Sequence, residues 1–206
     1  MVQGVNTITG ASSALDLDAQ LMLRVREGDE DSFRVLLEKH RNPVIRFVYR
    51  MVQDQAISEE LAQEVFLRVY RSRGTYEPTA RFTTWLFRIA THLALNWLRD
   101  VRNERGHQRL DDEGDGELPV REVSDRRPTV EQRMVAQTRL QEVRDAIAML
   151  PEKQRAAVLM HKYEEMEYAQ IAQVLECSES AVKSLLFRAY ESLRARLAHM
   201  STGGLG

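Results

Sequence analysis

A chain of 206 residues can hold one large or two small domains, and its 43% hydrophobic content is enough for ordinary cores. Five Pro and ten Gly are too few for a loop-rich or β-rich fold, and helix-favouring residues dominate nearly every segment, so we expect an all-α protein. The formal net charge of −2 excludes the strongly basic balance of a protein that binds nucleic acid unaided, so any such surface must come from local charge.

The N-terminal part is expected to open with a disordered lead over residues 1–15, which are small and polar and show no hydrophobic period. Asp16 or Asp18 then caps a helix that Gly28 ends. The next helical pattern continues through Pro43. Because proline removes a backbone donor, we expect this helix to kink or break there and to form a helical hairpin.

A further helix is expected to begin at Ser58, to carry a buried apolar stripe and to end at Gly74. Its outward face holds Glu60, Gln63, Glu64 and Arg68. This face is either solvated or a docking surface, and composition alone does not choose between the two.

The longest helix is predicted over residues 81–105, with Trp85 and Trp97 at core spacing. The opposite side, with the loop before it, combines rings, amides and guanidinium groups, namely Tyr76, Thr84, Arg88, His92, Asn96, Arg99 and Arg102. Such side chains can stack on an unpaired base, bond its edge and hold its backbone. On the residues alone, surface or packing roles are the alternative for Tyr76 and His92.

Charge is segregated around the end of this helix. Residues 81–109 carry six Arg against two acids, a net charge of about +4, whereas residues 111–126 carry seven acids against two Arg, a net charge of about −5. The pattern suggests a basic surface for nucleic acid or a partner, followed by an acidic linker over 106–128 that avoids binding to it. A solvated charged helix beside a disordered linker is the alternative.

The C-terminal part is expected to be a second helical domain over residues 129–199, followed by a tail over 200–206. Thr129 has the spacing of a capping box, and the helix it begins is carried by Ala136, Leu140, Val143 and Ile147. Pro151 stands at the start of the next helix. Two helical patterns, over 167–175 and from 179 onward, then meet across a turn in which Ser178 is placed to cap the second helix.

The last helix has two contrasting faces. Its apolar arc is formed by Val182, Leu185, Leu186, Ala189, Leu193 and Leu197, and its free arc by Ser180, Lys183, Ser184, Phe187 and Arg188. This arrangement predicts a helix-turn-helix whose second helix enters a DNA major groove, where the basic side chains reach phosphates or guanine, the hydroxyls bond either, and the aromatic ring meets a thymine methyl. A plain helical hairpin with a solvated face is the alternative.

Five stretches resemble bacterial extracytoplasmic-function (ECF) sigma factors of the sigma-70 family. They read ELAQEVFL at 60–67, FTTWLFRIA at 82–90, AMLPEKQR at 148–155, YAQIA at 168–172 and AVKSLLFRA at 181–189. The matches span about 16–105 and 130–197. Three positions depart from the family: Ser180 replaces a usual Gly, Leu185 a usual basic residue, and His92 a common Asn.

For the domain over 16–105, the resemblance implies sigma region 2. This domain would dock on the clamp of the β′ subunit of core RNA polymerase through Glu60, Gln63, Glu64 and Leu67. It would also recognise and melt the minus-10 element, with a flipped base captured near Tyr76 and His92. The residues implied at minus-10 DNA are Tyr76, Arg88, His92, Asn96 and Arg99.

For the domain over 129–199, the resemblance implies sigma region 4, which contacts the β flap of the polymerase and reads the minus-35 element. The residues implied at minus-35 DNA are Ser180, Lys183, Ser184, Phe187 and Arg188. An anti-sigma factor is expected as a further partner. The implied function is that of a sigma factor, which directs core polymerase to specific promoters while catalysis stays with the polymerase.

No catalytic constellation, phosphate-binding loop or cysteine pair is present, so we expect neither an enzyme nor a cofactor or metal site. The single cysteine, Cys177, excludes an intramolecular disulfide and fits a reducing compartment. With no apolar run long enough for a membrane span and no signal-peptide pattern, we expect a cytoplasmic protein. Two rival hypotheses stay open: a stand-alone helix-turn-helix regulator that binds an operator as a dimer, and a helical adaptor. Neither needs side chains for unpaired bases.

Overall fold

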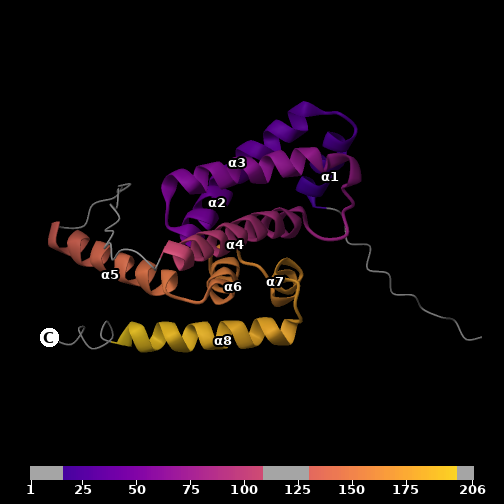
Figure 1. Ribbon diagram of the computed structural model, residues 1–206. Helices are drawn as coiled ribbons and strands as arrows, with labels where there is room; N and C mark the ends of the chain where they lie inside the picture. The colour runs from indigo at the N-terminus through magenta and orange to yellow at the C-terminus, as the bar shows by residue number, and fades with distance from the viewer. Residues whose placement is uncertain (1–15, 109–129, 199–206) are drawn as a thin grey trace, which may run out of the picture.

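A computed structural model describes residues 16–108 and 130–198, which form eight α-helices and one short 3₁₀ helix and contain no strand (Figure 1). The predicted all-α fold is confirmed. Within these described ranges, no helix has both the length and the apolar character needed to cross a bilayer. The expectations for the N-terminal lead, the capping residue Thr129 and the C-terminal tail lie outside the described residues.

The first domain consists of α1 (Leu17–Arg26), α2 (Glu30–Val52), α3 (Gln55–Arg71), the 3₁₀ helix η1 (Arg73–Thr75) and α4 (Phe82–Gln108). Its core lies where α2 packs against α3 and α4. The rings of Phe47 and Phe87 meet edge-on there, with centroids 5.1 Å apart, and Leu36 and Leu86 are fully buried beside them. The predicted long helix is present and continues to Gln108.

Carboxylates cap three helices of the first domain: Asp16 caps α1, Asp29 caps α2 and Asp54 caps α3. Asp16 accepts a hydrogen bond from the backbone N–H of Ala19 at 2.6 Å, as expected for α1. Asp54 caps α3 by accepting from the N–H of Ile57 at 2.9 Å. The expectation that α3 begins at Ser58 was therefore wrong, because an earlier acid provides the cap and the Ser58 side chain is buried one turn inside the helix.

Pro43 lies inside α2, which is one α-helix of 23 residues. The predicted hairpin at this point is absent from the described structure. Proline costs the helix one backbone hydrogen bond, but Val44, Phe47 and Val48 immediately after it are fully buried in the core. Their packing holds the helix in register across the proline, so tertiary contacts override the local signal.

The second domain consists of α5 (Val130–Ala148), α6 (Glu152–Tyr163), α7 (Tyr168–Leu175) and α8 (Glu179–Arg196). α8 packs across α6 and α7, and α7 and α8 form the predicted helix-turn-helix. Ile171, Val174 and Leu159 are buried in this core. Leu140 was expected there too, but its side chain is 58% exposed, so that prediction was wrong.

The two domains pack against each other. α7 lies on α4, and α6 lies against α2, so that α6 and α7 separate α4 from α8 (Figure 1). The buried apolar residues of both domains form one continuous cluster. The guanidinium of Arg155 on α6 donates to the carbonyl oxygens of Met51 in the first domain and of Ala148 and Leu150 in its own domain.

Candidate nucleic-acid interface

The exposed face of α8 is the first candidate surface. Ser178 caps the helix by accepting from the N–H of Ala181 at 3.1 Å, as predicted. Val182, Leu186 and Ala189 are buried against the rest of the domain. These contacts fix the rotation of the helix about its axis, so the side chains of the opposite face point away from the protein.

All five residues expected on the free face are exposed: Ser180, Lys183, Ser184, Phe187 and Arg188. The Phe187 side chain is 68% exposed, which is unusual for a large aromatic ring on a packed helix. The Ser184 hydroxyl donates to the carbonyl oxygen of Ser180 at 3.0 Å, so its lone pairs remain available to a donor. The face therefore offers two cations, an apolar ring and hydroxyl groups to a ligand.

A row of polar side chains along α4 is the second candidate surface. Arg88, His92, Asn96 and Arg99 are spaced three or four residues apart and lie on one side of the helix. Asn96 Oδ1 accepts from Arg99 Nη2 at 2.8 Å, which orients the amide and the guanidinium together. The two arginines and the amide are exposed, whereas His92 is only half-exposed.

His92 is half-exposed because the second domain lies beside it. Its Nε2 is 3.7 Å from Oε1 of Glu176, which follows α7. A crevice of about 260 Å³ lies between α4 and the start of α6. It is lined by His92, Leu95, Asn96, Arg99, Arg102, Glu152 and Lys153. Three members of the polar row, His92, Asn96 and Arg99, therefore line an interdomain crevice.

Tyr76 does not lie on the exposed side of α4, contrary to prediction. Its side chain is 4% exposed, and its ring packs against those of Trp85 and Phe82, with centroids 4.9 and 6.4 Å away. Burial, with the nearby carboxylates of Asp16 and Asp18, raises the pKa of Tyr76 to about 12. Its hydroxyl has no hydrogen-bond partner among the described residues.

Thr84, also expected on the exposed side, is buried as well. A pocket of about 270 Å³ lies beside Tyr76 and Thr84. Its walls are formed by Tyr76, Glu77, Thr79, Ala80, Thr84, Trp85, Arg88 and Gln173. Gln173 belongs to α7 of the second domain and was not among the predicted site residues, because nothing in the local sequence pattern indicates a contact across the two domains.

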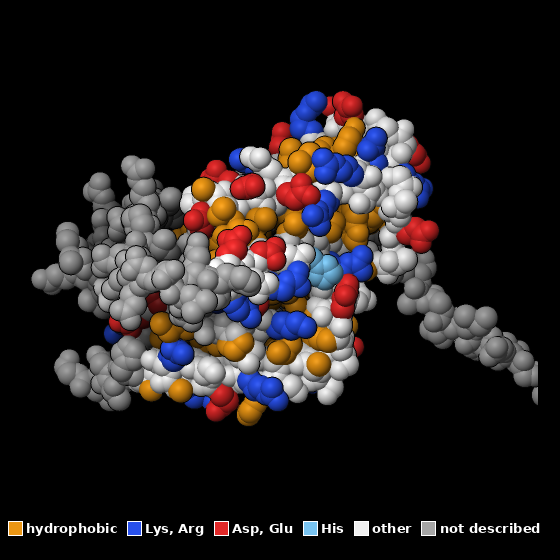
Figure 2. All heavy atoms as spheres, viewed as in Figure 1, with side chains coloured by type: hydrophobic (Ala, Val, Ile, Leu, Met, Phe, Trp, Pro, Cys, Tyr) orange, Lys and Arg blue, Asp and Glu red, His pale blue; other side chains and the backbone are white. Residues whose placement is uncertain are grey.

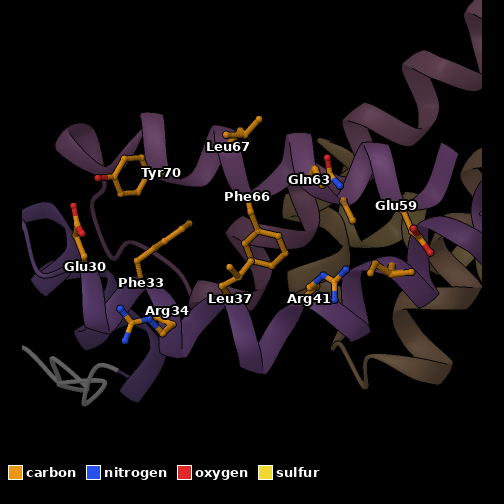
Figure 3. A pocket seen from close by; sticks show the side chains of 12 residues that line it. Glu30, Phe33, Arg34, Leu37, Arg41, Glu59, Gln63, Phe66, Leu67 and Tyr70 are labelled. Atoms are coloured by element: carbon orange, nitrogen blue, oxygen red, sulfur yellow. The ribbon is translucent and has the colours of Figure 1, made fainter. Parts of the chain in front are cut away.

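The outward face of α3 forms a third surface. Glu60, Gln63 and Leu67 are exposed, and Glu64 is half-buried and paired with Arg68 at 2.7 Å. Gln63 and Leu67 also line a groove of about 690 Å³ between α2 and α3. Figure 3 shows this groove, with Phe33 and Leu37 on α2 facing Phe66 on α3. An apolar groove beside exposed polar side chains is suited to binding another protein.

In the part of the chain that the structure describes, no group of three or more His, Cys, Asp or Glu side chains is placed to hold a metal ion. Cys177 is a free, half-buried thiol in the turn between α7 and α8.

Comparison with protein families gives two matches. The family described as sigma-70 region 2 matches residues 36–104, and the family described as sigma-70 region 4 matches residues 140–193. The first match contains the α4 row and the α3 face, and the second contains α7 and the part of α8 that carries its exposed face.

Among curated proteins, the chain is similar to RNA polymerase sigma-H factor of Pseudomonas aeruginosa, with 32% identity over 85% of this chain and 91% of the relative. RNA polymerase sigma factor CarQ of Myxococcus xanthus is 32% identical over 87% of this chain and 97% of its own. The ECF RNA polymerase sigma-E factor of Haemophilus influenzae is 30% identical over 87% of this chain and 95% of the relative.

Two solved structures share the fold. CnrH in complex with the cytosolic domain of CnrY has a TM-score of 0.63 and 19% identity, over 88% of this chain and 97% of that chain. The sigma factor RpoE of Bartonella quintana in complex with the anti-sigma factor NepR has a TM-score of 0.61 and 20% identity, over 81% of this chain and 96% of that chain.

Proposed function

The chain belongs to the ECF sigma factors of the sigma-70 family, and we propose that it directs core RNA polymerase to specific promoters through three surfaces on two domains. The α3 face docks on the β′ clamp, the α4 row engages the minus-10 element, and the α8 face reads the minus-35 element. The domain over 16–105 thus binds polymerase and melts DNA, and the domain over 129–199 reads duplex DNA and contacts the β flap.

The observation that carries this proposal is that one chain presents two separate polar surfaces of different chemical character, both suited to nucleic acid. The α8 face has the exposed cations, hydroxyls and aromatic ring that suit a major groove. The α4 row, 88 to 99, adds amide, imidazole and guanidinium groups suited to unpaired bases and their backbone. A stand-alone operator-binding regulator needs only the first of these surfaces.

The roles in the complex follow from the same assignment. RNA synthesis belongs to the polymerase, so this chain supplies recognition and no catalytic group. We place its action in the cytoplasm, where the polymerase works. We also propose an anti-sigma factor as a regulatory partner, since the α2–α3 groove offers apolar surface to a second protein and the similar RpoE structure contains such a partner.

Transcription from a library of templates tests the function and needs no chosen promoter. Core polymerase and the purified protein would transcribe templates with randomised minus-35 and minus-10 segments, and the transcribed templates would be sequenced. We expect two enriched elements at fixed spacing, and no enrichment with core polymerase alone. Binding of the protein to one palindromic duplex, with no effect on the polymerase, would favour the operator-binding regulator instead.

A further inference from the structure

The loop formed by residues 76–81, between η1 and α4, shapes the pocket beside Tyr76. Half of the residues that line this pocket come from the loop, and the others come from α4 and α7. Arg88 of the α4 row is one of them. Figure 2 shows several Lys and Arg side chains along the boundary between α4 and the second domain. Such cations can hold the phosphates of a strand while one of its bases enters the pocket, whose shape depends on the loop.

The loop has little hydrogen bonding of its own. Among the described residues, one backbone hydrogen bond lies within it, from the N–H of Thr79 to the carbonyl oxygen of Glu77 at 2.8 Å. Pro78 has no N–H to donate. Because holding a loop in one conformation costs conformational entropy, contacts from outside the loop must provide the restraint.

Both ends of the loop are held by α1, which lies against η1 and α4 (Figure 1). At the beginning of the loop, Nη1 of Arg26 donates to the carbonyl oxygen of Tyr76 at 3.3 Å. At its end, Oδ2 of Asp16 accepts from the N–H of Phe82, the first residue of α4, at 3.3 Å. Asp16 precedes α1 and Arg26 is its last residue. The two ends of one short helix therefore hold the two ends of the loop.

The carboxylate of Asp16 serves two helices at once. Its Oδ1 caps α1, and its Oδ2 bonds an N–H in the first turn of α4. Arg81, the residue before α4, has a side chain with donors only, so it cannot cap that helix itself. Asp16 supplies the missing acceptor from a position 66 residues away from Phe82.

α1 is itself fixed to the core of the first domain. Asp18 is buried, accepts from Lys39 of α2 and contacts the buried ring of His40. The His40 ring also packs against the Phe82 ring, with centroids 5.4 Å apart. Met22 of α1 is fully buried. A helix anchored by an ion pair and by apolar packing is a firm support for the loop beside it.

We propose that α1 holds the loop 76–81 in the conformation that forms the pocket, and that Asp16 and Arg26 are positioning residues for base recognition. This inference rests on the proposed function for the identity of the ligand, an unpaired base of the minus-10 element. Neither residue lines the pocket. Their effect passes through the backbone at the two ends of the loop, which sets where the side chains of the loop meet the base.

Asp16→Asn separates the two roles of this carboxylate. Asparagine caps a helix as well as aspartate does, so its oxygen can still cap α1, whereas an NH₂ group replaces the acceptor that faces the Phe82 N–H. Asp29→Asn is the matched control. Asp29 caps α2 in the same way, and its second oxygen accepts from the Ser32 hydroxyl of that same helix.

Arg26→Ala removes the anchor at the other end of the loop. Arg24→Ala is its matched control, since Arg24 is an exposed arginine in the same last turn of α1. Arg26→Lys should restore part of the wild-type behaviour, because an ammonium group can donate one hydrogen bond to the Tyr76 carbonyl oxygen.

Hydrogen exchange in the full chain tests the anchoring without DNA. The amides of the loop should exchange about tenfold faster in Asp16→Asn and in Arg26→Ala than in the wild type, and the Phe82 amide should do so in Asp16→Asn. Both controls should exchange as the wild type does. Unchanged exchange in the loop would overturn the proposal. An equal acceleration at every amide of the domain would overturn it too, because it would show a loss of global stability.

Base preference in transcription measures the positioning effect. Core polymerase with each variant would transcribe templates that carry each of the four bases at every position of the library-selected minus-10 element. We expect the preference at one position to fall about three- to tenfold in Asp16→Asn and in Arg26→Ala, with the minus-35 preference unchanged. Arg26→Lys should lie closer to the wild type. An equal loss at every position would show that α1 only stabilises the domain.

Failure of this inference can be told apart from failure of the proposed function. If the library selects no promoter, the proposed function fails and the assignment of the pocket to a base fails with it, while the exchange measurement still decides whether α1 holds the loop. If a promoter is selected and the loop loosens without any change in base preference, the proposed function stands and the positioning inference is wrong.

Discussion

His40 Nε2 lies 2.9 Å from Oδ2 of Asp18, and this contact joins α2 to α1 inside the first domain. Both side chains are buried, and Lys39 Nζ donates to the same carboxylate at 2.7 and 2.8 Å. At this distance the ring N–H donates to the carboxylate. Desolvation nevertheless outweighs the attraction of Asp18 and lowers the pKa of His40, so the neutral ring is favoured in the folded protein.

The first prediction concerns pH. The unfolded chain takes up a proton on His40 near pH 6.5, whereas the folded chain takes it up only at lower pH. The unfolded state therefore binds more protons as pH falls, and this contribution to stability is full above about pH 6.5 and is lost below it. Urea unfolding at pH 8 and pH 5.5, followed by tryptophan fluorescence, measures the loss, because Trp85 and Trp97 both lie in α4.

His40→Gln is the comparison for this measurement, since an amide can still donate to Asp18 but does not titrate. We expect the variant to lose less stability than the wild type between the two pH values. Equal losses in the two proteins would show that the ring does not control this pH dependence.

The second prediction separates the ring of Tyr76 from its hydroxyl. Because the hydroxyl has no described partner, Tyr76→Phe should change the free energy of unfolding by less than about 0.5 kcal/mol. Tyr76→Ala should cost about 3–5 kcal/mol, because it opens a cavity against Trp85 and Phe82. The same fluorescence-detected urea titration measures both. A loss above about 1 kcal/mol for the phenylalanine variant would indicate a buried water bound to the hydroxyl.

Features that depend on residues close together in the sequence could be predicted, and those that depend on distant contacts could not. The two faces of α8 and the cap at Ser178 are predictable, because the hydrophobic period and the capping bond join residues a few positions apart. Pro43 and Tyr76 are not, because their surroundings are set by contacts distant in sequence. Pro43 is held by the core around Phe47, and Tyr76 lies in a loop, where no period indicates which side chains turn inward.

The interface between the domains could not be predicted from the sequence either, because its contacts also join residues that are distant in the chain. His92 and Glu176 come from segments on either side of the linker. No local pattern relates the two positions. The row on α4 was predicted from the sequence, whereas the half-exposed state of His92 beside Glu176 required the structure.

The third prediction concerns polymerase docking. Gln63→Ala with Glu64→Ala should weaken binding to core polymerase by about tenfold, or 1.4 kcal/mol, since both side chains lie on the proposed docking face. Helicity should change little, because only the exposed pair of Glu64 with Arg68 is lost. Fluorescence anisotropy with labelled core enzyme measures the affinity. Glu38→Ala, an exposed acid on α2 outside the groove, is the control, and an equal loss in both variants would argue against docking through α3.

The last prediction concerns base reading by α8. Arg188→Ala should weaken binding to the minus-35 duplex by about 1–3 kcal/mol and relax the preference at one base pair, because a bidentate contact to a guanine edge is lost. Competition between duplexes that differ at single base pairs measures both effects. Arg194→Ala is the control on the same helix, since Arg194 pairs with Glu191 and lies outside the predicted reading face. If Arg188→Ala weakens every duplex equally and lowers the salt dependence, the guanidinium contacts a phosphate, and the base preference must come from other side chains of this face, with Lys183 and Phe187 the next to be substituted.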